Sequence, residues 1–170
     1  YVGNKALGDS VNTKVSLNKA NTTVPATSTA SASSDVYDVS SIVENCMPSV
    51  VSITNVGTQE FRTIFGNYEQ ESQSSGSGII IGQNDTELLI VTNNHVVSGA
   101  KELSVYFNSD GQDADEDNVI SAKIKGTDAN KDLAVIAVQL SDIPQETMNS
   151  IKAATIGDSS AMKVGEPVVA

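Results

Sequence analysis

Short apolar segments separated by turn residues make up most of the chain after Pro48. Six of these segments are rich in β-branched residues and lie at residues 49–56, 76–82, 87–92, 102–107, 119–126 and 132–138. No long stretch with a helical period separates them. Runs of this length and spacing are typical of antiparallel strands that share one core. The pattern therefore predicts an all-β fold, either an antiparallel barrel or a sandwich.

A short helix is predicted just before Pro48. Ser41 and Glu44 have the Ser-x-x-Glu spacing of a capping box, and Pro48 cannot continue a helix, so about two turns are expected. One face of this helix is apolar and comprises Ile42, Val43, Cys46 and Met47. Cys46, the single cysteine, is therefore expected to be a small buried apolar residue rather than a reactive thiol.

The first 35 residues differ in composition from the rest of the chain. Residues 18–35 consist mainly of Ser, Thr, Ala and Asn, which is typical of a solvated linker or stalk. Only residues 11–18 alternate apolar and polar positions as a strand does. We expect residues 1–35 to form a linker or arm that lies against its own domain or against a neighbouring chain.

A long polar connection is predicted between the first two apolar segments. It covers residues 57–75 and carries three aromatic residues, Phe61, Phe65 and Tyr68. Few of its positions are apolar, so we expect a surface loop.

A second connection, at residues 108–118, is short and acidic. Its alternating residues Asp113, Asp115 and Asp117 resemble the first ligands of a helix-loop-helix calcium site. Asn118 stands where such a loop needs Gly, however, and Ile124 stands at the position of the final Glu ligand. We expect a solvated hairpin tip and no metal site.

Charge and length exclude several classes of function. Ten Lys and Arg against 21 Asp and Glu give a net charge of −11, which opposes binding to nucleic acid or to an anionic membrane. No run of 18 apolar residues and no leader pattern is present. Membrane attachment would therefore need an anchor upstream of Tyr1.

The only histidine, His95, follows the apolar segment at residues 87–92. That position places it at the rim of a sheet, where a side chain can meet a substrate. With no second histidine and one cysteine, a histidine-rich zinc site is excluded. A lone histidine is more often structural than catalytic, so a general base and a structural residue both remain possible.

Asp132 opens an apolar segment 37 residues after His95 (132 minus 95). A partly buried carboxylate there needs hydrogen-bond donors, and an imidazole is a natural one. Such a contact would fix the tautomer of the ring and stabilise the imidazolium. The alternative is a turn aspartate bonded to backbone amides, as expected for Asp128. From the residues alone, the two interpretations have equal weight.

Four segments occur in a characteristic order, at residues 74–81, 90–97, 126–138 and 156–170. They read SSGSGIII, IVTNNHVV, GTDANKDLAVIAV and IGDSSAMKVGEPVVA. In sequence and order they resemble the HtrA/Deg family of trypsin-like serine endopeptidases, and the resemblance runs from about Ser41 to Ala170. The second and third segments together carry most of its specificity.

The resemblance implies a fold and two catalytic roles. His95 would be the general base and Asp132 the residue that orients it, with the acidic connection at 108–118 absorbing a somewhat longer spacing. Residues 36–164 would form the first six-stranded antiparallel barrel of a two-barrel protease, after a short helix and an extended N-terminal tail. Residues 165–170 would begin the second barrel.

No nucleophile is expected in this chain. The resemblance places the catalytic serine in a Gly-Asn-Ser-Gly-Gly segment of the second barrel, beyond Ala170. Gly157-Asp158-Ser159 opens like a protease motif, but no glycines follow to form the tight turn of an oxyanion hole. Ser77 precedes a strand, and the glycines beside it suit close packing of the backbone. These 170 residues alone are therefore expected to be inactive.

The resemblance also implies partners. Relatives usually form trimers through N-terminal segments that carry an aromatic residue before the first helix, a place that Tyr37 occupies here. Phe61, Phe65 and Tyr68 would lie in a regulatory loop that can reach another subunit, or in an ordinary mobile loop. Substrates would be unfolded or misfolded polypeptides, no cofactor is expected, and a PDZ domain would follow.

The expected location is outside the cytoplasm, in the cell envelope of a bacterium, with a membrane anchor in the full-length protein. Two other functions remain possible. One is a non-catalytic homologue that uses the barrel for binding. The other is a secreted all-β adhesion module on a stalk.

Overall fold

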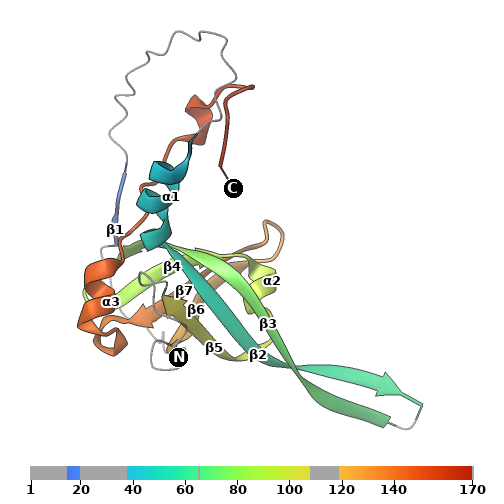
Figure 1. The fold of residues 1–170 in the computed structure, drawn as a ribbon. Coiled ribbons are helices and arrows are strands. Elements are labelled where there is room, and N and C mark those ends of the chain that lie inside the picture. Colours follow the sequence, from blue (N-terminus) through green and yellow to red (C-terminus); the bar gives the residue numbers. More distant parts are fainter. Residues whose placement is uncertain (1–14, 20–37, 65, 108–118, 170) are drawn as a thin grey trace, which may run out of the picture.

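A computed structural model describes residues 15–19, 38–64, 66–107 and 119–169 (Figure 1). Their strands are β1 (Ser16–Leu17), β2 (Val50–Thr63), β3 (Gly66–Gln83), β4 (Glu87–Thr92), β5 (Ala100–Phe107), β6 (Val119–Asp128) and β7 (Leu133–Gln139). The sheet has the order β1-β3-β2-β5-β6-β7-β4, and β4 also pairs with β3. Strands β2 to β7 therefore close into a six-stranded antiparallel barrel. This confirms the all-β prediction and decides between barrel and sandwich.

The helical elements are short and lie outside the barrel wall. They are α1 (Ser40–Cys46), η1 (Met47–Ser49), α2 (Asn94–Val97), η3 (Leu140–Asp142), α3 (Gln145–Ser150) and η4 (Ser159–Ala161). No helix in the described ranges is long and apolar enough to cross a membrane.

Aliphatic side chains at alternate strand positions fill most of the barrel interior, together with Phe107 of β5 and Val97 of α2. Its most deeply buried residues are Val51, Ile53, Ile80, Ile90, Val97, Val105, Phe107, Ile136 and Val138. This period of two is the one that an antiparallel sheet with a single buried face imposes. Gly78 allows the wall to close, because a Cβ there would lie 2.7 Å from Ile90 Cγ2 and 2.8 Å from Ile53 Cδ1. The close packing predicted for the glycines beside Ser77 is thus confirmed at Gly78.

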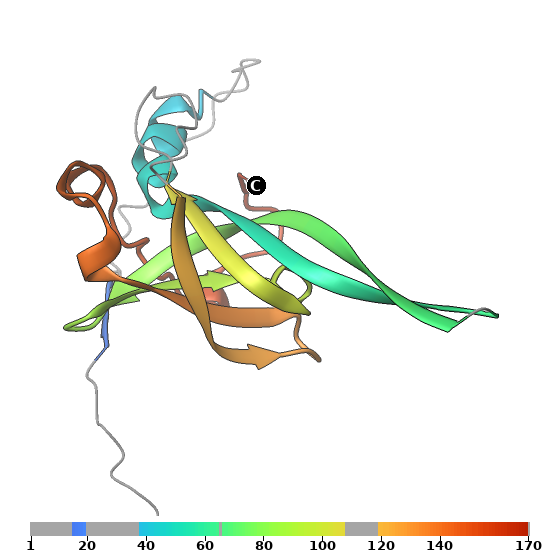
Figure 2. The same ribbon diagram turned by 90° about the horizontal axis from the view of Figure 1, so that it is seen from below.

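The prediction of a surface loop at residues 57–75 is wrong. β2 and β3 remain paired from Val50 opposite Ile79 to Thr63 opposite Gly66. Figures 1 and 2 show the result, a two-stranded ribbon that projects from the barrel. The backbone groups that face each other across the ribbon pair without any apolar face, so the polar side chains gave no warning of it. Phe61 and Tyr68 are register partners near its tip, and Phe65 lies outside the described residues.

Two details of the predicted N-terminal helix are also wrong. The helix ends before Pro48 as expected, but Val39 is its N-cap and no side chain caps it, so the capping box of Ser41 and Glu44 does not form. Cys46 is exposed rather than buried. The reason is that no described element covers the apolar face of α1, which stands away from the barrel (Figure 2). Tyr37 and residues 108–118 lie outside the described residues.

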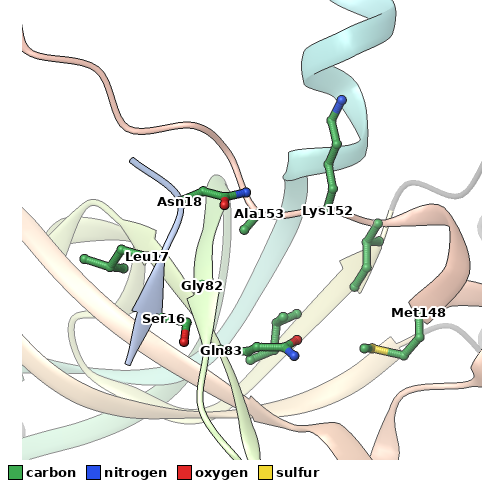
Figure 3. A pocket seen from close by; sticks show the side chains of 10 residues that line it. Ser16, Leu17, Asn18, Gly82, Gln83, Met148, Lys152 and Ala153 are labelled. Atoms are coloured by element: carbon green, nitrogen blue, oxygen red, sulfur yellow. The ribbon is translucent and has the colours of Figure 1, made fainter. Parts of the chain in front are cut away.

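Part of the N-terminal tail lies on its own barrel. β1 extends the sheet at β3, with Ser16 opposite Gln83 and Leu17 opposite Gly82. A cavity of about 210 Å³ lies between β1, β3 and α3, and Gln83 and Met148 both line it (Figure 3). The tail was predicted to lie either against its own domain or against a neighbouring chain. For the residues of β1, the structure shows the first of these positions. Residues 162–169 follow η4 without forming a strand, so the start of a second barrel there stays a prediction.

Candidate active site

The antiparallel pairing of β4 with β7 builds one rim of the barrel. Thr92, the last residue of β4, lies opposite Ala134, the second residue of β7. The chain leaving β4 enters α2, which contains His95, while Asp132 immediately precedes β7. Two segments distant in sequence therefore meet at this rim.

Asp132 holds His95 by two hydrogen bonds. His95 Nδ1 lies 2.7 Å from Asp132 Oδ2, and the backbone N–H of His95 donates to Asp132 Oδ1 at 2.9 Å. An ionised carboxylate only accepts, so Nδ1 carries the proton and, in the neutral ring, Nε2 keeps a lone pair. The predicted juxtaposition of these two side chains is confirmed.

Asn93 is a third member of the cluster, and the sequence analysis missed it. Its Nδ2 donates to the backbone oxygen of Asp132 at 3.0 Å and to Oδ2 at 3.2 Å. The only available signal was its place directly after an apolar segment. Asparagine is common in any turn, so that signal did not distinguish it.

The backbone of Asp132 adopts an unusual conformation. Its φ of 52° is the only positive φ of a residue other than glycine in the described part of the chain. This left-handed conformation costs about 1–2 kcal/mol for most residues, although Asp and Asn tolerate it better than others. Strained residues of this kind gather at functional sites.

The alternative interpretation of Asp132 was a turn aspartate bonded to backbone amides. In the structure, that description applies to Asp128. Asp128 Oδ1 accepts bonds from the backbone N–H groups of Asn130 and Lys131, which makes it the turn aspartate of the β6–β7 connection. The backbone donor to Asp132 comes from His95, far along the chain.

These contacts keep the carboxylate of Asp132 ionised. The pKa of Asp132 is lowered from its ordinary value of 3.8, mainly by the backbone N–H of His95 and then by the His95 ring. The site is open, with 71% of the His95 side chain and 44% of the Asp132 side chain exposed. A negative charge at neutral pH beside the ring stabilises an imidazolium.

No hydroxyl of the described residues bonds to the ring of His95. Ser77 lies within β3, where its carbonyl accepts a bond from Thr92 Oγ1 at 2.7 Å. Ser159 lies in η4, which Figure 1 shows well away from α2. Neither serine is placed to lose a proton to His95.

No metal site is formed by the residues that the structure describes. They contain no group of three or more His, Cys, Asp or Glu side chains that could hold an ion. The acidic segment at 108–118 lies outside that part of the chain.

Comparison with known families identifies the fold. The profile of the trypsin-like peptidase domain matches residues 76–170, more than half of the chain, and includes both His95 and Asp132. The chain belongs to the trypsin-like peptidase family. The predicted fold class, a barrel of a trypsin-like domain, is thereby confirmed.

Relatives of this trypsin-like chain include several bacterial serine proteases. The "Serine protease Do-like HtrA" of Bacillus subtilis is 37% identical over 143 residues, covering 81% of this chain and 29% of the relative. A "Probable periplasmic serine endoprotease DegP-like" of Hahella chejuensis is 36% identical over 160 residues, covering 80% and 30%. The "Serine protease Do-like HtrA" of Lactococcus lactis subsp. cremoris is 32% identical over 165 residues, covering 90% and 37%.

These matches confirm the resemblance to HtrA and Deg proteases. The chain spans only 29% to 37% of the length of these three relatives.

Proposed function

We propose that this chain supplies the base and its orienting acid to a serine endopeptidase of the HtrA/Deg type. His95 is the general base and Asp132 is the residue that orients it. The 2.7 Å contact between His95 Nδ1 and Asp132 Oδ2 carries the proposal. The lowered pKa of Asp132 and the relatives named as serine proteases support it.

The reaction is acyl transfer to a serine. Nε2 of His95 takes the hydroxyl proton as the serine oxygen attacks the scissile carbonyl carbon. When the tetrahedral intermediate collapses, the C–N bond breaks and the same nitrogen gives its proton to the leaving amine. Water then attacks the acyl-enzyme by the same route. Asp132 stays ionised throughout and stabilises the imidazolium.

In this proposal the nucleophilic serine lies outside these 170 residues, so the chain is inactive by itself. Neither Ser77 nor Ser159 bonds to the ring of His95, which supports that assignment. A non-catalytic homologue or an adhesion module gives no account of the oriented imidazole or of the strained Asp132 that holds it.

Fluorophosphonate labelling of the full-length protein tests the proposal, because the probe reacts with a serine activated by a base. We expect one modified serine beyond Ala170 and a labelling rate about a thousandfold lower in His95→Ala. Ser159→Ala is the matched control and should label as the wild type does. Absence of label, or label on Ser77 or Ser159, would contradict the proposal.

The names of relatives support a wider role for the protein. Several of them are named as probable periplasmic serine endoproteases, which supports a location outside the cytoplasm, in a bacterial cell envelope. We propose unfolded or misfolded polypeptides as substrates and a membrane anchor upstream of Tyr1. The homotrimer with Tyr37 at its contacts, the regulatory role of Phe61, Phe65 and Tyr68, and the downstream PDZ domain stay predictions.

A further inference from the structure

Asp132 holds only one end of the short helix that carries His95. α2 contains four residues, and Asp132 binds the backbone N–H and the ring of His95 near its start. A single helical turn is not stable by itself, and the last carbonyl oxygens of a helix have no partner within it. The orientation of His95 therefore also depends on what holds the other end of α2.

Asn55 of β2 holds that other end. Its Nδ2 donates to the backbone oxygen of Val96 at 2.9 Å and to that of Ser98 at 3.2 Å. Val96 directly follows His95, and Ser98 is the C-cap of α2. One amide group thus supplies a donor to two carbonyl oxygens at the end of the helix, where the helix itself offers none.

Asn55 is an exception among the inward positions of its strand. Val51 and Ile53 are 1% and 0% exposed, and Asn55, at 3%, continues the same alternation. A buried amide costs free energy unless it forms hydrogen bonds, and an aliphatic side chain would fill the core at no such cost. Both bonds of this amide go to the α2 segment. Asn55 is therefore accounted for by the placement of α2 and not by the packing of the barrel.

β3 supports α2 from the same part of the barrel. Val96 is buried, and a Cβ on Gly76 would lie 2.5 Å from Val96 Cγ2 and 2.8 Å from Cγ1, so glycine lets this side chain rest on the strand. Gly76 pairs with Ile53 of β2. Apolar contacts are not directional, so they keep the turn against the barrel, whereas the hydrogen bonds of Asn55 fix its orientation.

We propose that Asn55 is a positioning residue that keeps the imidazole of His95 against Asp132. This inference rests on the proposed function. Without the tie, α2 can shift on the barrel, and His95 Nδ1 can leave its 2.7 Å contact with Asp132 Oδ2. A misplacement of about 1 Å in a catalytic group can lower the rate about a hundredfold. Asn55 bonds to the backbone around His95 and not to its ring, so it acts through His95.

Fluorophosphonate labelling of full-length Asn55→Leu separates positioning from stability, because it gives two quantities. The final stoichiometry counts the folded enzyme, and the rate constant reports how well the base activates the serine. We expect the rate constant and kcat to fall about thirtyfold, with KM within about twofold of the wild-type value. Leu also removes Asn55 Oδ1, a buried oxygen without a partner among the described residues, which offsets part of the lost stability.

Thr92→Val is the matched control. Thr92 is also buried, and its Oγ1 donates to the backbone oxygen of Ser77 at 2.7 Å, so this variant too loses a bond from a buried side chain to the backbone. The backbone of Thr92 pairs with β3 on one side and β7 on the other, so its position does not depend on the side chain. Its labelling rate constant should stay within about threefold of wild type.

Gly76→Ala displaces α2 from the side of β3 and provides a second test. The added methyl group would push against Val96 and should lower the labelling rate constant about tenfold. Val96→Ala in the same chain removes the two Cγ atoms that the methyl group meets, so it should recover most of the loss. Two changes that only destabilised the core would instead add their effects.

The outcomes separate the two proposals. A wild-type rate constant in Asn55→Leu, or an equal fall in Thr92→Val, overturns the positioning role. If Asn55→Leu does not fold, Gly76→Ala decides: a wild-type rate constant there, or a loss that Val96→Ala fails to recover, overturns the role. Absence of label in the wild type removes the proposed function, and the positioning role with it.

Discussion

The two ends of the β4–β7 strand pair carry the same chemistry in two different settings. At one end Glu87 opens β4 opposite Gln139, and at the other the pair ends near Asp132 and His95. Each end has a carboxylate that accepts hydrogen bonds from a neighbouring segment and links it to the barrel. Only one of them has the properties of a catalytic site.

The Glu87 end has the properties of a structural contact. Lys125 Nζ donates to the Glu87 carboxylate at 3.0 and 3.2 Å, and Gln139 Nε2 donates at 3.1 Å. The Glu87 side chain is 13% exposed, and its bonds join β4, β6 and β7. Its partners are an ammonium and an amide, and in these contacts both nitrogens act only as hydrogen-bond donors. This contact can only hold strands together.

The Asp132 end differs in its donor and in its backbone. The donor is an imidazole, which keeps a second ring nitrogen without a partner among the described residues. The acceptor sits in a left-handed conformation that a merely structural carboxylate would not need. A carboxylate contact therefore indicates catalysis when its partner can still react and when the backbone is strained to form it.

Paired substitutions should give the largest difference between the two ends. Asp132→Asn keeps the shape and suits the left-handed backbone, but it removes the acceptor that fixes the His95 tautomer. We expect peptide turnover by the full-length protein to fall about ten-thousandfold. Glu87→Gln removes the matching charge at the other end and should change turnover less than threefold, about the effect of a surface ion pair. Steady-state kinetics of the two purified variants measures both effects.

Near-normal turnover in Asp132→Asn would show that Asp132 has another role. Circular dichroism must show the wild-type fold in both variants, because a folding defect would also abolish activity. Equal losses in both variants would mean that the two ends do not differ in function.

Only some of the residues at the ends of the β4–β7 strand pair could be predicted from the sequence. His95 and Asp132 could be predicted because their motifs are specific when taken together, although the residues alone left Asp132 undecided. Asn93 could not, since its role depends on the left-handed turn that brings the backbone oxygen of Asp132 within its reach.

The fold was predictable where burial determines it. Short apolar segments separated by turn residues predicted the strands that enclose the core. The β2–β3 ribbon could not be foreseen, because backbone pairing holds it rather than an apolar face. The exposure of Cys46 could not be predicted either. The apolar face of α1 indicates that the face should be covered, but it does not indicate whether any described residue covers it. The pattern of apolar residues thus indicates which segments are buried and does not indicate which strands pair.

Asn93→Ala sharpens the comparison by weakening the support of Asp132 while keeping the carboxylate. The substitution removes both donations from Nδ2, so the turn before β7 is held less firmly. We expect kcat to fall about tenfold with KM nearly unchanged, because the residue positions the orienting acid and not the substrate. A rise in KM at unchanged kcat would place Asn93 in substrate binding instead.

The smallest expected effect is on stability. Here the substitution of Glu87 should have a larger effect than the substitution of Asp132. Glu87→Gln should lower the free energy of unfolding at pH 7 by about 1 kcal/mol, since it removes a charge-assisted contact that joins three strands. Asp132→Asn should leave the melting temperature nearly unchanged, because that site is open to solvent.

The pH dependence of that effect identifies its cause. Lys125, and to a lesser degree Gln139, lower the pKa of Glu87 from its ordinary value of 4.5. A lowered folded-state pKa stabilises the protein above the unfolded-state value, and this contribution is lost as the pH falls through the folded-state value. Wild type and Glu87→Gln should therefore differ in urea unfolding at pH 7 and converge well below pH 4.5. A difference that persists in strong acid would assign the effect of Glu87 to packing instead of charge, and the Glu87 end would then no longer be the electrostatic counterpart of Asp132.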